Sequence, residues 1–416
     1  MKNSVTFKSR AEVAARWLVL ASAFAVPLPA AWVSVSTALF LIAWLCAGHF
    51  AERWAVIRRH PLAWLSLALL GWMALAIAWS PASLKTSVDN WWHFRELLLL
   101  PLMLSVVAKD DATADAWQPR ILNAFLAGFI INLCVSYLRW SGLLPELQAT
   151  GRYAGFGGHV GFSTMLAFMS YVCWQRVREQ KAWAWAWGLL SLACLGNLFL
   201  INTGRTGQVG LLVLLPLALF GWIGWRGLLT SALAVPVLAV GLYFGSPTVH
   251  QRVDQMVADI AGFHAGNAES NDGMRIDFWV HSLGFIREAP LLGVGTGGYI
   301  AKYKQLAVTE GLTGGRISDN PHNEYLLIAS QQGLVGLALL LALWGVQWRG
   351  SGRLTPERRD LTRALLLLMA SGDLFNSFLL DNLEGHFYLL LSVALCAHWP
   401  VRPGADARLQ PVACTA

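Results

Sequence analysis

The sequence predicts an all-α, polytopic integral membrane protein. Of its 416 residues, 56% are hydrophobic and only 13% are charged, and the mean hydropathy is +0.50. Soluble domains carry roughly 25% charged residues. Apolar stretches recur along the chain, most of them near the ~20 residues that a membrane-spanning helix needs. Composition and these stretches together indicate a protein that crosses the bilayer many times.

About twelve stretches qualify as membrane spans. The expected spans are 14–30, 31–49, 62–80, 95–108, 120–140, 158–175, 183–202, 207–225, 228–245, 323–347, 363–380 and 386–400. The fourth is short and contains Pro101, so it could be re-entrant or kinked. The first could be misread as a signal peptide, but no small-residue cleavage site follows it, and we expect it to be retained.

The positive charges predict the orientation. With the N-terminus in the cytoplasm, cytoplasmic segments hold 20 of the 31 Lys and Arg residues, short outer segments hold 5, and one long outer loop holds 6. Short loops rich in Lys and Arg stay in the cytoplasm, whereas long loops carry little weight. Twelve spans with both ends in the cytoplasm satisfy this rule. The net charge of +7 is therefore a topology signal, and we expect no nucleic-acid partner.

The chain divides into four parts. They are spans one to nine (1–245), the outer loop (246–322), spans ten to twelve (323–402) and a short cytoplasmic tail (403–416).

The outer loop is expected to carry two or three amphipathic helices. Apolar residues recur at helical spacing from Val253 through Met256 to Ile260. A second helix is expected from Met274 to about Glu288, and its apolar side is expected to consist of Phe278, Trp279, Leu283 and Ile286. Such helices lie in the membrane interface, where they could roof a lateral cavity. A passive cap is the alternative.

Several kinds of site have no signature in this chain. The segment Gly293–Gly298 matches G-x-G-x-x-G, but no strand precedes it, so a tight turn between loop helices is expected instead. There is no Walker A loop, no serine nucleophile elbow and no short-loop carboxylate cluster. Five of the six cysteines fall in spans, which makes structural disulfides unexpected. We expect neither a cofactor nor a metal.

His322 is the leading candidate for acid–base chemistry. It stands at the start of span ten, where Asp319 or Asn320 could cap the helix and Pro321 suits its first turn. A helix N-terminus disfavours protonation of a nearby imidazole, and a neutral imidazole can act as a general base. The alternative is a histidine that only bonds a neighbour.

Two arginines are candidates for binding an anion. Arg205 lies in a glycine-containing outer turn between two apolar spans, and a guanidinium at that depth is costly without an anionic partner. Pyrophosphate suits arginine because it accepts two parallel hydrogen bonds. Arg275 begins the second loop helix, and Asp277 cannot share its face. A snorkelling interface arginine remains the alternative for Arg205.

Further polar residues are expected on the same side of the membrane. Arg152 and His159 lie in one outer segment, Arg95 lies near the start of span four, and Asp381 occupies the turn before span twelve, together with Glu384 and His386. Each could instead be a solvated turn residue.

Four motifs resemble the O-antigen ligase family, within the superfamily that also includes O-antigen polymerases and bacterial protein O-oligosaccharyltransferases. They are Gly151-Arg-Tyr-Ala-Gly-Phe-Gly-Gly-His159, Thr203-Gly-Arg205-Thr-Gly-Gln208, Ile286-Arg-Glu-Ala-Pro-Leu-Leu-Gly-Val-Gly-Thr-Gly-Gly-Tyr299 and Asn320-Pro-His322-Asn-Glu-Tyr-Leu326, with Arg275 between the second and third. The first motif departs from the family at His159, where many relatives have Pro-Asn, so no catalytic role is assigned to it.

The resemblance implies a metal-independent GT-C glycosyltransferase of a Gram-negative inner membrane, with its active site in the periplasm. The donor would be O-antigen on undecaprenyl pyrophosphate, and the acceptor a sugar hydroxyl of lipid A–core oligosaccharide. His322 would be the base, Arg205 and Arg275 would bind pyrophosphate, and Arg152, Arg95, Asn320, Tyr325 and Asp381 are possible additions to the site. Membrane lipids are further partners. A polymerase, a protein O-oligosaccharyltransferase and a lipid-linked glycan transporter remain alternatives.

Overall fold

The computed structural model describes residues 2–108, 114–146, 153–202, 204–245, 247–264, 271–310, 318–397 and 399. Every regular element within these ranges is helical, which confirms the predicted all-α class. Arg152 and the predicted cytoplasmic tail, residues 403–416, lie outside the described residues.

Each predicted span corresponds to a helix or to a helix with a short helical extension. In chain order these are α1 (Lys2–Ala25), α2 (Ala30–Ala47), α4 with η1 (Pro61–Leu75, Ala76–Trp79), α6 (Glu96–Val107), α7 (Ala114–Trp140), α8 (Gly158–Glu179), α9 with η3 (Ala184–Gly196, Asn197–Ile201), α10 (Arg205–Ile223), α11 (Trp225–Gly245), α15 (Glu324–Ser351), α16 (Pro356–Gly372) and α17 (Asn382–Cys396). Short helices connect them: α3 (Phe50–Arg59), α5 (Leu84–Trp92) and η2 (Lys181–Trp183).

Seven of these helices in the described part of the chain are long and apolar enough to cross a membrane, by length and composition. The chain is therefore a polytopic membrane protein. The fourth predicted span, α6, is a shorter apolar helix that runs continuously through Pro101 and is mostly buried.

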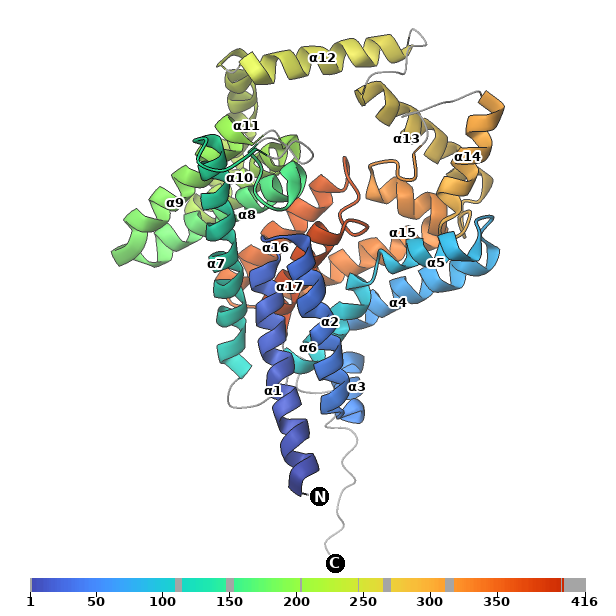
Figure 1. The fold of residues 1–416 in the computed structure, drawn as a ribbon. Coiled ribbons are helices and arrows are strands. Elements are labelled where there is room, and N and C mark those ends of the chain that lie inside the picture. Colours follow the sequence, from blue (N-terminus) through green and yellow to red (C-terminus); the bar gives the residue numbers. More distant parts are fainter. Residues whose placement is uncertain are drawn as a thin grey trace, which may run out of the picture.

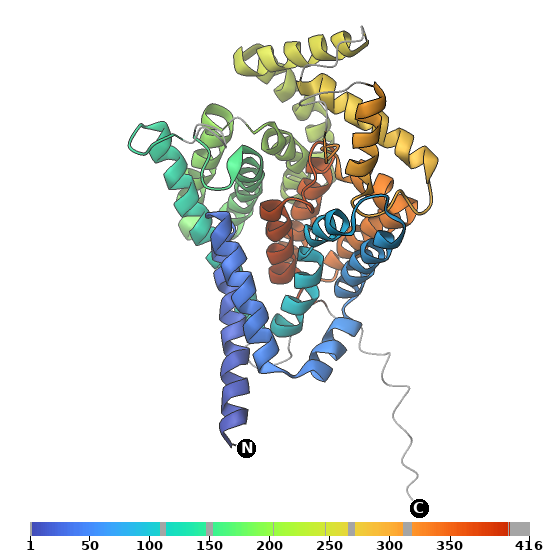
Figure 2. The same cartoon turned by 45° about the vertical axis from the view of Figure 1, so that its right-hand side comes forward.

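The outer loop forms three helices, α12 (Pro247–His264), α13 (Asn271–Glu288) and α14 (Gly298–Glu310). The two expected helices are confirmed, but the apolar side predicted for the second is partly wrong. Leu283 is exposed, while Phe285 is buried against Tyr299 of α14. Helix α12 runs across one end of the molecule, and the N-terminus of α1 lies at the opposite end (Figures 1 and 2).

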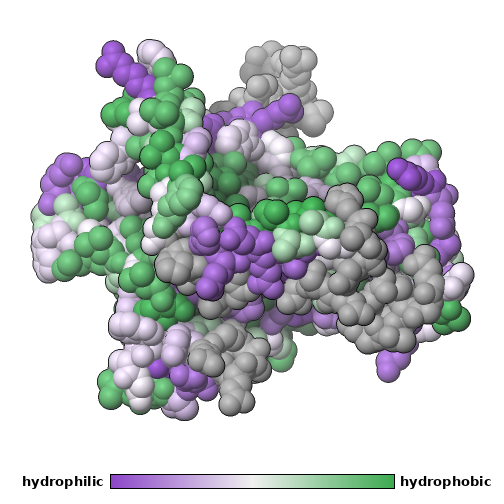
Figure 3. Space-filling view, turned by 90° about the horizontal axis from the view of Figure 1, so that it is seen from above, coloured by the Kyte–Doolittle hydropathy of each residue, from purple (hydrophilic) through white to green (hydrophobic). Residues whose placement is uncertain are grey.

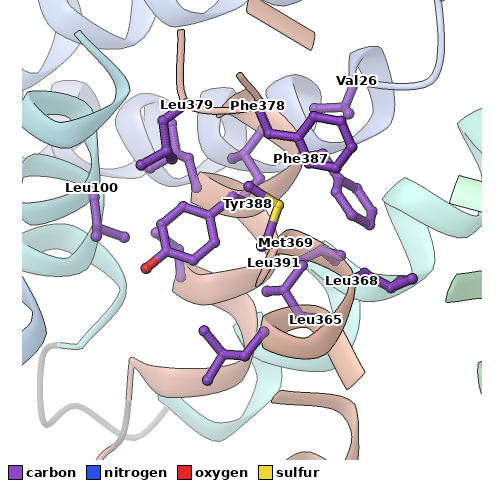
Figure 4. Close-up of a cluster of buried hydrophobic side chains, with 14 of the residues drawn as sticks. Val26, Leu100, Leu365, Leu368, Met369, Phe378, Leu379, Phe387, Tyr388 and Leu391 are labelled. Atoms are coloured by element: carbon purple, nitrogen blue, oxygen red, sulfur yellow. The ribbon is translucent and has the colours of Figure 1, made fainter. Parts of the chain in front are cut away.

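Helix α17 lies in the interior, where it contacts α6, α7 and α16. Every residue from Leu383 to Cys396 is buried. From Phe387 onward the helix is apolar on almost every side, which suits a position inside a helix bundle. Phe387 and Tyr388 sit at the centre of this core (Figure 4).

The glycine-rich turn docks into a break in α15. Gly333 has a φ of 68°, which interrupts the helix and leaves nearby backbone groups without their usual helical hydrogen-bond partners. The turn occupies that break: the Val294 amide donates to the Ser330 carbonyl at 2.8 Å, and the Leu334 amide donates to the Pro290 carbonyl at 2.8 Å. Gly293 has a φ of 72°, and a side chain there would overlap the backbone of residue 331. The expected tight turn is confirmed, and it connects the loop helices to the membrane bundle.

Candidate active site

A cavity of about 550 Å³ lies where α8, α10, α12, α13 and the connection between α16 and α17 meet. Its lining residues are His159, Val160, Arg205, Thr206, Val209, Met256, Ile260, Arg275, Ile276, Trp279, Phe375 and Asn376. The two arginines singled out from the sequence therefore share one cavity. Among the described residues that line it, the ionisable side chains are two arginines and a histidine, with no carboxylate. The cavity thus favours an anion.

Close helix packing places Arg205, the first residue of α10. A side chain at Gly204 would overlap the carbonyl oxygen of His159 and the side chain of Ser163, and one at Gly207 would overlap the backbone of Ser163. These two glycines therefore allow α10 to start directly against α8. The Arg205 side chain is exposed where it borders the cavity.

Arg275 reaches the cavity from the loop side. Its Nη1 donates to the carbonyl oxygen of Phe375 at 3.2 Å, which ties α13 to the α16–α17 connection. Asp277 is buried on another side of α13, where its Oδ2 accepts a hydrogen bond from the hydroxyl of Tyr303 at 3.2 Å. The expectation that Asp277 does not share the face of Arg275 is confirmed.

A constrained turn holds His322. Its φ is 52°, a left-handed conformation that is uncommon outside glycine, although histidine is among the residues that adopt it more often. The Oδ1 atom of Asn320 accepts hydrogen bonds from the His322 amide at 2.8 Å and from the Ser377 hydroxyl at 2.8 Å. The Nε1 of Trp279 donates to the Pro321 carbonyl at 3.0 Å.

The predicted cap of the following helix is wrong. Asn323 caps α15, because its side-chain oxygen accepts from the Leu326 amide at 3.0 Å. The Asn320 side chain is committed to the His322 turn, and Pro321 precedes the helix instead of forming its first turn.

The surroundings keep the His322 imidazole neutral. Burial lowers the pKa of His322 most, the nearby charge of Arg275 lowers it further, and Asp319 opposes both. The expected direction of the pKa shift is confirmed, although its causes are burial and Arg275. His322 is not among the cavity-lining residues; it lies beside the cavity, close enough to feel the charge of Arg275 and packed beside the ring of Phe278. A half-buried neutral imidazole there can accept a proton.

Arg95 and Asp381 belong to a second polar group. The Arg95 guanidinium donates to the side chain of Asn382 and lies 3.4 Å from Glu96. Surrounding protein atoms shield the carboxyl of Asp381 from water, and this desolvation raises its pKa to about 6. The residue as a whole is still in contact with solvent. The charge of Asp319 acts on both Asp381 and His322, so these two residues lie near the same carboxylate.

Glu384, His386 and Tyr325 make structural contacts inside the helix bundle. Glu384 and His386 are buried within α17 instead of lying in an open turn, and His386 Nδ1 is 3.0 Å from the carboxylate of Glu96. The Tyr325 hydroxyl donates to the Ala370 carbonyl at 2.8 Å, which holds α15 against α16.

Sequence reasoning missed two polar lining residues, Thr206 and Asn376. The Asn376 Nδ2 donates to the Thr206 hydroxyl at 3.0 Å. No sequence signal connects these positions, because they come from different spans. His159, which the sequence offered only as a secondary candidate without a catalytic role, borders the same cavity. In the described ranges, no group of three or more His, Cys, Asp or Glu residues is arranged to hold a metal ion.

Fold and site together define a polytopic helical membrane protein with a cationic cavity beneath its outer loop. Residues 189–341 match the family model Wzy_C, described as O-antigen ligase, so this segment of the chain is similar to that family. The recognition made from the motifs is confirmed, since Arg205, Arg275 and His322 all fall within the matched segment.

A relative in Haemophilus influenzae (strain ATCC 51907 / DSM 11121 / KW20 / Rd) is named only as an uncharacterized protein. It is 30% identical over 125 residues, which amount to 28% of this chain and 30% of that protein. The match thus spans less than a third of the length of that relative.

Proposed function

We propose that the protein is an O-antigen ligase, a glycosyltransferase that moves polysaccharide from undecaprenyl pyrophosphate to a sugar hydroxyl of lipid A–core. One observation carries the proposal: Arg205 and Arg275, from different helices, line one cavity, and His322 lies beside it within the field of Arg275. The family match over the same segment supports this assignment.

The arginines bind the leaving group. Cleavage of the bond between the anomeric carbon and the pyrophosphate oxygen places negative charge on the diphosphate. Guanidinium groups stabilise this charge through paired hydrogen bonds, and such fixed donors are worth about 3–4 kcal/mol each in comparable sites. The cavity brings Arg205 from the membrane bundle and Arg275 from the outer loop to the same anion.

His322 deprotonates the acceptor. The acceptor oxygen gives its proton to the neutral imidazole and forms a bond to the anomeric carbon from the side opposite the leaving pyrophosphate. The electron pair of the broken bond stays on the pyrophosphate, and the anomeric configuration inverts. The lowered pKa of His322 supports this role, because the imidazole is unprotonated at neutral pH.

The proposed topology is twelve spans with both termini in the cytoplasm of a Gram-negative cell and the active site in the periplasm. It is supported by the position of α12 and α13 at the end of the molecule opposite the start of α1 (Figures 1 and 2). Seen from the α12 side, hydrophilic residues gather near the middle of this face with hydrophobic surface beside them (Figure 3). Exposed Met256, Val257 and Ile260 of α12 would contact membrane lipids and the polyprenyl tail.

The test is transfer in a purified system. Detergent-solubilised protein is mixed with undecaprenyl-pyrophosphate O-antigen and rough lipopolysaccharide, with EDTA and without nucleotide. A ladder of capped lipopolysaccharide supports a metal-independent ligase. Longer lipid-linked glycan without capped product would identify a polymerase. A glycosylated protein acceptor would identify an O-oligosaccharyltransferase. No change in any glycan would support the alternative function, a transporter of lipid-linked glycan.

A further inference from the structure

His159 is the cavity residue that neither the motif analysis nor the proposed mechanism uses. It is the second residue of α8, its side chain is exposed, and it borders the same cavity as Arg205 and Arg275. An imidazole carries N–H groups that can donate to an anion. No carboxylate lines the cavity within the described residues, so the groups that face His159 there are cationic or neutral.

The backbone that carries His159 is fixed from two sides. On one side, the carbonyl oxygen of His159 occupies the space where a side chain at Gly204 would lie, so α10 packs directly against it. On the other side, side chains at Gly157 and Gly161 would overlap the side chain of Leu383 at the start of α17. The glycines of this segment therefore serve close packing, and they hold His159 at a set position on the cavity wall.

The same packing brings two helix starts to one wall. Helices α8 and α10 begin next to each other, and their N-cap residues, Gly157 and Gly204, offer no side-chain cap. In the first turn of α10, the Gly207 amide donates to the Ser163 hydroxyl of α8 at 3.2 Å. Helix N-termini carry partial positive charge and favour anions. The bundle side of the cavity thus offers Arg205, His159 and the Thr206 hydroxyl, while Arg275 faces them from α13. This two-sided arrangement suits a diphosphate better than a single phosphate.

We propose that His159 is a further diphosphate-binding residue of this cavity, which holds the pyrophosphate of a polyprenyl-linked donor together with Arg205 and Arg275. The inference rests on the proposed function and extends it. His159 acts on binding of the donor, and proton transfer stays with His322. Its loss should therefore raise the KM for the donor and leave kcat and the KM for the acceptor unchanged.

The experiment measures binding of farnesyl pyrophosphate and farnesyl phosphate to the detergent-solubilised full-length protein by calorimetry. We expect the pyrophosphate to bind more tightly. His159→Gln should weaken pyrophosphate binding about five- to tenfold, the usual loss for one hydrogen bond. His159→Lys, which keeps a hydrogen-bond donor, should retain most of the affinity. His250→Gln is the matched control, because the side chain of His250 in α12 is partly exposed and does not line the cavity.

The outcomes separate this inference from the function on which it rests. Equal pyrophosphate affinity in the wild type and His159→Gln would overturn the role of His159 while leaving the ligase intact. A wild-type protein that binds no farnesyl pyrophosphate would overturn the diphosphate cavity itself. A loss shared by His159→Gln and His250→Gln would indicate a general effect on the protein, and the inference would then fail.

Discussion

The indole nitrogen of Trp279 donates a hydrogen bond to the carbonyl oxygen of Pro321 at 3.0 Å. This contact joins the helix that carries Arg275 to the turn that carries His322. Because Trp279 also lines the cavity, a single side chain touches both the anion-binding wall and the turn of the proposed base. The distance between leaving-group site and base is thus set by a contact between the loop and the start of α15.

Trp279→Phe should lower turnover more than substrate binding. The phenyl ring keeps most of the packing against Phe375 but removes the donor to Pro321. A misplacement of His322 by a fraction of an ångström should lower kcat about tenfold, since catalysis depends steeply on geometry. Trp185→Phe, at an exposed position of α9, is the control. An unchanged kcat in Trp279→Phe would show that the hydrogen bond does not position His322.

Arg205 and Arg275 should respond differently to lysine than to glutamine. Lysine keeps the charge but loses the paired hydrogen bonds, whereas glutamine loses both. We expect losses in kcat/KM of about 10-fold for each lysine variant and about 10²–10³-fold for each glutamine variant. Steady-state transfer with a titrated donor measures these values. Arg226→Gln, an exposed arginine at the start of α11, should remain active. Full activity in Arg205→Gln would mean that Arg205 does not bind the pyrophosphate and is only a snorkelling arginine at the membrane interface.

The pH dependence of transfer should reveal the charges around His322. A base works only when unprotonated, so activity falls as the pH drops through its pKa. Burial and Arg275 lower the pKa of His322, which places the acid limb below the ordinary histidine value of 6.5. Arg275→Gln removes one lowering charge and should move this limb to higher pH. Asp319→Asn removes the opposing charge and should move it to lower pH. Limbs that stay fixed in both variants would exclude His322 as the titrating group.

Asn320 should matter for stability as well as for activity. Its side-chain oxygen accepts from the His322 amide and the Ser377 hydroxyl, and it supports the left-handed backbone of His322. Asn320→Ala should lower the free energy of unfolding by about 1–3 kcal/mol, because buried donors lose their acceptor. Ser377→Ala removes one of the two donors and should cost less. Thermal unfolding in detergent compares them, and a larger loss in Ser377→Ala would contradict this account of the turn.

Much of the fold follows from local sequence. The apolar stretches predict helices because backbone polar groups in lipid must be satisfied within the segment. They do not reveal the break in α15 at Gly333, since the turn that completes it comes from residues before α14. Contacts between distant segments also explain why the predicted N-cap of α15 was wrong. Asn320 and Asn323 are equally good caps by local sequence, and their contacts with Ser377 and Leu374, respectively, decide that Asn323 is the cap.

Sequence reasoning selected the ionisable residues of the candidate site. Arg205, Arg275 and His322 stood out because ionisable groups at a membrane boundary need partners. Thr206 and Asn376 did not stand out, because polar residues at helix ends are common and only packing brings these two together. The burial of Glu384 and His386 was missed for a related reason. His386 pairs inside the bundle with Glu96, which is far away in the sequence, and both residues lie within the buried helix α17.

The most direct test of the account compares His322→Ala with the wild type in a single-turnover assay, using donor already bound to the purified protein. We predict that transfer to lipid A–core falls about 10²–10⁴-fold, the contribution of a positioned base, while farnesyl pyrophosphate binds as tightly as before. His250→Ala, another histidine of the outer face, should transfer at the wild-type rate. Transfer by His322→Ala at the wild-type rate would contradict the central claim that this imidazole takes the acceptor proton.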